Sequence, residues 1–234
     1  MSSGSPRRRR PRLISVLGFA VAVVLCTGAY VLGQRWAPWQ DGSTHGRWHA
    51  VFDGQGATLA TRYDGKPAVL LAPKRTTRAA ETHAALVVTT GRYSDFVARV
   101  RVRTISQLRA PAANPWEVGW VLWGYTAPGR FYALTLKPNG WELSKQDPSY
   151  PGGQRFLASG HSPGFTVGAW HTIGITQTAN NIVASADGHV LVRFSDRERP
   201  YLHGSLGLYT EDARAEFVLH DVSALPVPPT GLRS

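Results

Sequence analysis

The sequence predicts an all-β domain, a jelly-roll sandwich of two antiparallel sheets, preceded by one N-terminal transmembrane helix. Two observations predict the sheets: about a dozen short apolar runs are separated by turns rich in Gly, Pro, Asn and Asp, and no helical periodicity follows residue 33. So many strands in about 180 residues are typical of two packed layers. A third observation, an uncharged apolar run near the N-terminus, predicts the helix.

The N-terminal segment has the pattern of a membrane anchor. Residues 1–12 form a basic cytoplasmic tail, and residues 13–33 carry no charge. A helix needs about 20 such residues to cross a bilayer, and arginines before it keep that end in the cytoplasm. The competing interpretation is a signal peptide cleaved near residues 27–29. We expect an uncleaved, single-pass anchor in the cell membrane, with the domain outside the cytoplasm and with Trp36 and Trp39 at the interface.

Composition excludes several classes of protein and of site. The net charge is +11, but six of the 26 Lys and Arg residues precede Trp36, and no basic module of a nucleic-acid-binding protein follows. The single cysteine, Cys26, lies in the apolar segment, so the domain has no disulfide, cysteine nucleophile or Cys₄ zinc site. The spacing HExxH is also absent.

The domain itself is expected over residues 48–225, after a linker at residues 34–47 and before a tail at residues 226–234. In residues 93–104, Phe96 and Val100 alternate with Arg99 and Arg101, the pattern of a strand with one buried face. The expected strands cover residues 48–53, 67–73, 83–90, 93–104, 116–125, 130–137, 141–146, 154–160, 204–211 and 214–225, with three more within 170–196.

Residues 170–196 read as three strands joined by tight turns. The segments "TANN" and "ADG" supply residues that tolerate the backbone angles of a hairpin turn. Apolar residues alternate along these strands, among them Ile173, Ile175, Val190, Val192 and Phe194, and we expect them to face the core. The meander is therefore assigned to the scaffold and not to a binding site.

Residues 167–196 and 204–225 together resemble the C-terminal half of concanavalin A-like jelly-roll domains. Over residues 48–225 the chain is similar to exported bacterial proteins of the 3-keto-disaccharide hydrolase type, which are related to laminin-G-like and family-sixteen glycosidase folds. The resemblance implies a jelly-roll fold and contact with extracytoplasmic sugar.

Two features depart from these relatives. The E-x-D-x-x-E strand of family-sixteen glycosidases, which carries their catalytic carboxylates, is missing. Related domains often hold a structural calcium through an acidic pair in the last strand. Here His220 replaces the first acid, and histidine is a poor ligand for calcium, so Asp221 is the one remaining metal candidate and no other cofactor is expected.

Aromatic and charged residues gather between residues 116 and 150, where we place the candidate site. By strand parity, Trp116 and Trp120 are expected to face the core, and Glu117, Trp123 and Tyr125 the wetter face. The candidate binding residues are Trp123, Tyr125, Tyr132, Lys137, Trp141, Lys145 and Asp147, and the candidate catalytic pair is Glu117 and Glu142. We expect Trp123, Trp141, Glu117 and Lys145 to line one groove.

The favoured function is a membrane-anchored, extracytoplasmic domain that binds cell-wall or extracellular glycan. The first alternative is an enzyme, a glycoside or 3-keto-disaccharide hydrolase, which would need two carboxyls about 5 Å or about 6.5–9.5 Å apart across an aromatic groove. The second alternative is an envelope scaffold, which would show a flat apolar patch instead. The expected partners are carbohydrate and the membrane, without nucleic acid; the sequence predicts no oligomeric state.

Overall fold

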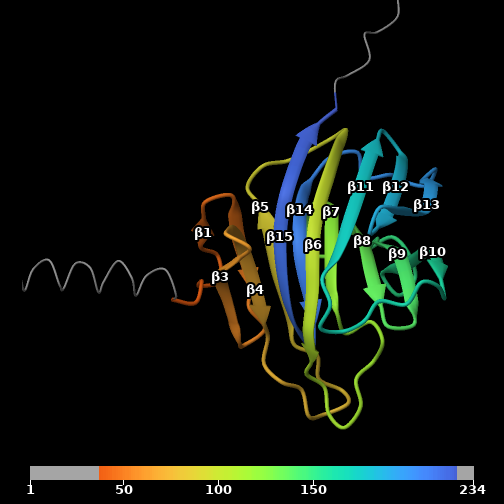
Figure 1. The fold of residues 1–234 in the computed structure, drawn as a ribbon. Coiled ribbons are helices and arrows are strands. Elements are labelled where there is room, and N and C mark those ends of the chain that lie inside the picture. The colour runs from red at the N-terminus through yellow and green to blue at the C-terminus, as the bar shows by residue number, and fades with distance from the viewer. Residues whose placement is uncertain (1–36, 226–234) are drawn as a thin grey trace, which may run out of the picture. The chain divides into compact units, whose positions relative to one another are not determined.

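The computed structural model describes residues 37–225, which form a sandwich of two antiparallel sheets (Figure 1). The predicted anchor at residues 13–33 and the tail at residues 226–234 lie outside the described residues. Within residues 37–225 no helix is long and apolar enough to cross a membrane. The strands are β1 (Thr44–His45), β2 (Trp48–Phe52), β3 (Ala57–Tyr63), β4 (Lys66–Ala72), β5 (Ala84–Thr89), β6 (Phe96–Gln107), β7 (Gly119–Ala127), β8 (Arg130–Lys137), β9 (Gly140–Gln146), β10 (Gln154–Gly160), β11 (His171–Thr178), β12 (Asn181–Ala186), β13 (His189–Ser195), β14 (Ser205–Glu211) and β15 (Ala213–Ala224).

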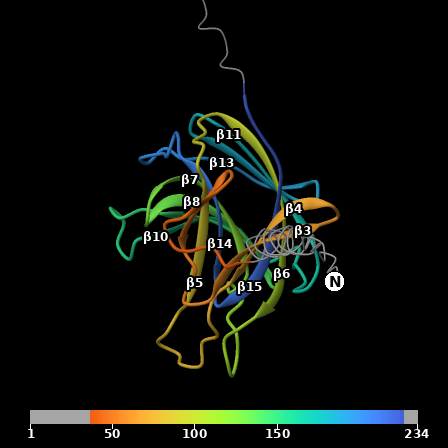
Figure 2. The ribbon, with the colours of Figure 1, turned by 90° about the vertical axis from the view of Figure 1, so that its left-hand side faces the viewer.

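The strand order places the last two strands in the middle of the two layers (Figures 1 and 2). Sheet A has the order β1-β2-β5-β14-β7-β8-β9-β10, and sheet B has the order β13-β12-β11-β6-β15-β4-β3. Thus β14 pairs with β5 and β7, and β15 pairs with β6 and β4. The predicted all-β sandwich is confirmed for the described residues.

The main core lies between the sheets. Phe96 and Val100 of β6 are buried in it, and Arg99 between them points outward, as the alternation predicts. Phe217 of β15 and Leu134 of β8 are also fully buried there. Burial of these apolar side chains is the main term that holds the sheets together.

The domain begins earlier than predicted. The side chain of Trp39 is 7% exposed and belongs to the main core, and its ring stacks on His45 with centroids 4.5 Å apart. Its backbone N–H donates to the carbonyl of Thr58, at 2.8 Å. The expectation that Trp39 lies at a membrane interface is therefore wrong. Strands β1 and β3 were not predicted; β3 mixes threonine and alanine and lacks a clear apolar alternation.

The meander of β11, β12 and β13 packs on the core largely as expected. Ile173 and Ile175 are buried, and Phe194 packs against the core from a partly buried position. The inward orientation predicted for Val190 is wrong, because its side chain is 51% exposed. The pairing of β12 with β13 shifts between Ala184 and Ser185, and such a bulge reverses the side-chain parity of the strand beyond it.

Candidate functional site

A second apolar cluster lies on the face of sheet A that points away from sheet B. It is distinct from the main core and contains Leu86, Val88, Val118, Trp120, Leu122, Phe131 and Ala133, with Tyr125 and Tyr209 packed against it. Trp120 and Tyr209 meet edge to face, with ring centroids 5.2 Å apart. An outer sheet face this rich in aromatic side chains is unusual for a surface in contact with water alone.

The strand register aligns one row of side chains across this face. Glu142 of β9 pairs with Thr135 of β8, Thr135 pairs with Trp120 of β7, and Trp120 pairs with Tyr209 of β14. Tyr209 in turn pairs with Leu86 of β5. Because paired residues share a face, their side chains all project to the same side of the sheet.

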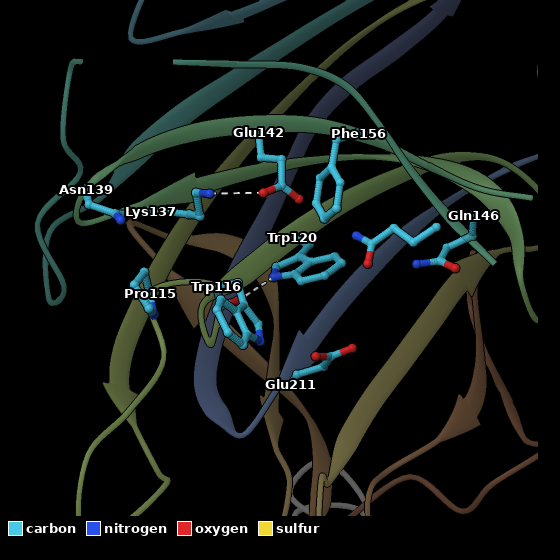
Figure 3. A pocket seen from close by; sticks show the side chains of 10 residues that line it. Pro115, Trp116, Trp120, Lys137, Asn139, Glu142, Gln146, Phe156 and Glu211 are labelled. Atoms are coloured by element: carbon cyan, nitrogen blue, oxygen red, sulfur yellow. Dashed lines mark hydrogen bonds and ion pairs between the residues drawn. The ribbon is translucent and has the colours of Figure 1, made fainter. Parts of the chain in front are cut away.

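The same face is hollowed by two adjoining pockets, of about 480 Å³ and about 270 Å³, which share Trp120, Gln146 and Glu211. We call them together the outer groove. The larger pocket is lined by Pro115, Trp116, Trp120, Lys137, Asn139, Glu142, Gln146, Gln154, Phe156 and Glu211 (Figure 3). The smaller pocket adds Phe52, Leu86, Tyr125, Pro128, Gly129, Phe131 and Tyr209.

Two exposed aromatic rings border the larger pocket. Trp116 is 45% exposed and precedes β7, and Phe156 is 67% exposed and lies on β10. Trp120, which is 4% exposed, lies deeper, and its indole N–H donates to the carbonyl of Trp116 at 2.8 Å. That hydrogen bond ties the Trp116 backbone to the groove floor (Figure 3).

Polar groups accompany the rings. Lys137 Nζ lies 3.0 Å from a carboxylate oxygen of Glu142, and both side chains line the groove (Figure 3). The hydroxyls of Thr135 and Ser144 are buried on the same face, and neither has a hydrogen-bond partner among the described residues. Buried hydroxyls are normally paired, so these two are unusual, but neither residue lines either pocket.

The pKa of the Glu211 carboxyl, which lines the groove, is raised. Burial is the main cause that raises its pKa, and the neighbouring charges of Asp212 and Glu117 raise it further; the hydroxyl of Tyr209, which donates a hydrogen bond to it, and the charge of Arg109 act in the opposite direction. Burial and the same carboxyl also raise the pKa of Tyr209. Glu211 therefore has an increased tendency to hold a proton.

The two groove carboxyls are separated by the floor. Glu142 and Glu211 lie on β9 and β14, which are three strand spacings apart in sheet A. At about 4.8 Å per spacing, the two strands are about 14 Å apart. In Figure 3, Trp120 lies between them. This spacing does not resemble the close pair of a retaining glycosidase, whose carboxyls are about 5 Å apart.

Glu117, the other member of the predicted catalytic pair, lies outside the groove. It is 1% exposed and forms an ion pair with Arg109, whose guanidinium also contacts Asp212. Its carboxylate also accepts the backbone N–H of Asn114 at 3.0 Å. The predicted pairing of Glu117 with Glu142 across one groove is therefore wrong. Glu117 instead stabilises the loop before β7 through its contacts with Arg109 and Asn114.

The expected parity of the aromatics on β7 is reversed. Trp123 is fully buried in the main core, whereas Trp116 and Trp120 face the groove. Tyr125 does reach the outer face, because Gly124 (φ 62°) forms a bulge that shifts the register after Trp123. Sequence alternation alone does not reveal such a bulge.

Three other predicted binding residues lie in the interior, close to the turn that follows β13. Lys145 is completely buried, with its ammonium 2.7 Å from Asp196. Tyr132 donates its hydroxyl to the same carboxylate, at 2.5 Å. Asp147 is 2% exposed and accepts a hydrogen bond from Arg199 at 2.9 Å. These residues order a loop and do not line the groove.

Trp141 and Asp221 complete the predicted set. Trp141 is 7% exposed in the main core, and its indole N–H donates to the carbonyl of Ser162 at 3.2 Å. The groove predicted for Trp123, Trp141, Glu117 and Lys145 therefore does not form. Asp221 is exposed on β15, and within residues 37–225 no three His, Cys, Asp or Glu side chains are grouped to hold a metal ion.

The structure thus brings Lys137, Glu142 and Tyr125 of the predicted set to the outer groove. Five further lining residues were not predicted from the sequence: Trp116, Trp120, Phe156, Gln146 and Glu211. Arg155 beside Phe156 and the short strand with few apolar residues were the available signal for an edge strand with an outward ring.

Comparison with known proteins identifies the fold. No protein-family profile matches the sequence, and no curated protein matches it either. Among solved structures, the chain is similar to the carbohydrate-binding module CBM66 from Bacillus subtilis, with a TM-score of 0.54 and 14% identity over 79% of this chain and 98% of that one. It is also similar to a glycoside hydrolase family 16 endo-glucanase from Bacteroides ovatus, with a TM-score of 0.51 and 9% identity over 80% and 98% of the two chains. A third similar structure is a glycosidic hydrolase, with a TM-score of 0.50 and 14% identity over 82% and 96%. The concanavalin A-like jelly-roll fold is therefore confirmed.

Proposed function

We propose that the domain binds a carbohydrate chain along the outer groove, and that residues 13–33 hold it on the outer side of the cell membrane. The observation that carries the proposal is the position of Trp116 and Phe156. Both rings are solvent-exposed at one pocket whose other lining residues are largely polar. A flat ring can pack on the C–H face of a sugar while nearby amides and carboxylates bind its hydroxyls.

The extent of the groove indicates an oligosaccharide or polysaccharide. Its lining residues run from Phe52 on β2 to Phe156 on β10, which are six strand spacings apart in sheet A. That corresponds to about 29 Å of sheet. A surface of this length accommodates several linked sugar units.

The charges of the groove favour a neutral or amino sugar. Glu142 and Glu211 line the larger pocket with a single cation, Lys137, which already pairs with Glu142. An acidic glycan would bring a further negative charge to this surface. We therefore expect glycans rich in uronate or sulfate to bind more weakly than neutral chains of the same length.

The test is binding of the full-length chain to a glycan array, followed by titration of the best soluble oligosaccharide. Trp116→Ala and Phe156→Ala should each weaken binding by about 1–3 kcal/mol, by analogy with the stacking of bases on aromatic side chains. Tyr150→Ala is the matched control, because Tyr150 is 42% exposed but does not line the groove. Unchanged affinity in both groove variants would refute the assignment of the site.

One observation favours hydrolysis of a glycoside or 3-keto-disaccharide as a second candidate function. Glu211 has a raised pKa beside the floor tryptophan, and a protonated carboxyl is what a general acid requires. If the protein is an enzyme, Glu211→Gln should abolish release of reducing sugar while oligosaccharide binding persists. If no released sugar is detected for the unmodified chain with any bound glycan, binding remains the function.

A further inference from the structure

A second site lies away from the outer groove. A pocket of about 450 Å³ is bordered by β1 and β2 of sheet A and by β4 and β15 of sheet B. It is lined by His45, Gly46, Arg47, Trp48, Lys66, Pro67, Val69, Phe217, Leu219 and His220. Trp48, Val69 and Phe217 are buried in the main core, so the floor of the pocket is apolar and fixed.

The lining of this pocket carries positive charge only. Arg47 and Lys66 contribute a guanidinium and an ammonium, and no carboxylate is among the lining residues. Other cations of the described chain, such as Arg103 and Arg109, form ion pairs with carboxylates. Among residues 37–225, no such ion pair involves Arg47 or Lys66.

The hydrogen bond between Lys66 and His220 shows which nitrogen of the imidazole is a donor. Lys66 Nζ lies 3.2 Å from His220 Nδ1. Because an ammonium can only donate, Nδ1 accepts, and the proton of the neutral imidazole is on Nε2. The pocket therefore combines an ammonium, a guanidinium and an imidazole N–H, all of them donors.

The positive charges around His220 contribute to a lowered pKa of its imidazole. Burial lowers its pKa first, and the charges of Lys66, Arg101 and Arg99 lower it further, while the charge of Asp221 acts in the opposite direction. A negative charge placed among these cations would raise the pKa of His220.

We propose that this pocket binds a phosphate group, with Lys66, Arg47 and His220 as its donors. A phosphate offers several acceptor oxygens to donors that approach from different directions, which suits this set better than a single carboxylate. The apolar floor accommodates the organic part of a phosphate ester. The group can come from a soluble phosphate ester or from a phospholipid headgroup, and the site is independent of the proposed glycan groove.

The experiment follows the His220 titration by NMR in the full-length chain, with the signal assigned through His220→Gln. Inorganic phosphate, compared with chloride at equal ionic strength, should raise the midpoint of that titration by about 1 pH unit. Lys66→Gln should weaken phosphate binding about tenfold through loss of a charge-assisted hydrogen bond. Arg193→Gln, an exposed cation on β13 that does not line the pocket, should leave it unchanged.

Two further measurements distinguish a soluble phosphate ester from a phospholipid headgroup as the source of the phosphate. Glycerol 3-phosphate tests the soluble ester, and vesicles of phosphatidylglycerol, compared with vesicles of phosphatidylcholine, test the headgroup. The readout in both is the His220 midpoint and not vesicle association, because the predicted anchor would itself bind lipid. The proposal is overturned if no phosphate source moves the midpoint beyond chloride, or if Arg193→Gln weakens the effect as much as Lys66→Gln.

Discussion

The ammonium of Lys145 lies 2.7 Å from Asp196 Oδ2, and both side chains are buried. Lys145 also donates to the carbonyls of Glu198 and Arg199, at 2.8 and 2.7 Å, and lies over the ring of Tyr201. A single buried cation therefore fixes the start of the connection between β13 and β14.

Replacing Lys145 by methionine should destabilise the protein strongly. The variant leaves the Asp196 carboxylate buried without its cation, which costs about 3–5 kcal/mol. The control is Arg78→Met, whose ion pair with Glu81 is largely exposed and should cost less than about 1 kcal/mol. Urea unfolding of the two variants measures the difference, and equal losses would contradict the assigned role of Lys145.

Acid should weaken the same contact. Burial alone would raise the pKa of Asp196, but hydrogen bonds from Lys145 and Tyr132 hold that pKa below its usual value. A carboxyl with a depressed folded pKa contributes stability that is present above its unfolded pKa of about 3.9 and is lost as the pH falls through the folded pKa.

The free-energy difference between the unmodified chain and Asp196→Asn should therefore be largest near neutral pH and shrink below about pH 4. Urea unfolding at a series of pH values tests this prediction. Asp41→Asn, at an exposed position, is the control and should show no such convergence. A difference that stays constant down to about pH 2 would argue against the ion pair as its source.

Substitutions of Trp123, on β7, and of Trp116, just before β7, should have opposite effects on stability and on glycan affinity. Trp123→Ala removes a ring with no exposed surface and should cost about 3–5 kcal/mol of stability, with glycan affinity retained in the molecules that stay folded. Trp116→Ala should cost little stability and lose affinity, because its ring is partly in solvent. Thermal unfolding and glycan titration on both variants check the pair; loss of affinity only in Trp123→Ala would reverse the assignment of faces.

The anchor prediction can be tested in cells. We expect the full-length protein to remain in the membrane fraction after a carbonate wash, with its C-terminus open to external protease on spheroplasts. The physical reason is the uncharged run at residues 13–33 behind a cluster of arginines. A soluble mature form that begins near residue 29 or 30 would instead support the cleaved signal peptide.

The strands were predictable from sequence because alternation and turn residues are local signals. The alternation of Phe96 and Val100 with arginines gave both the strand and its buried face. The site was less predictable, because both faces of β7 carry large apolar side chains and either could have been the core. Only the pairing of Trp120 with Tyr209 and Thr135, on the outer face, shows that Trp123 turns inward.

Charged residues misled the prediction for a different reason. Glu117, Lys145 and Asp147 looked like surface groups, yet each is compensated by a partner distant in sequence or across a loop. Sequence spacing does not show that Lys145 meets Asp196, since the contact depends on how β9 and the turn after β13 come together in the fold.

The central positions of β14 and β15 bear on how the chain acquires its structure. Without β14, sheet A separates into β1-β2-β5 and β7-β8-β9-β10, and without β15, sheet B separates into β13-β12-β11-β6 and β4-β3. Each half would then present an unpaired strand edge, which is prone to association with other chains. A chain emerging N-terminus first cannot close either sheet until residues 205–224 have been synthesised. Protection of these open edges during synthesis, and during any passage across a membrane, is therefore a requirement that the topology itself imposes.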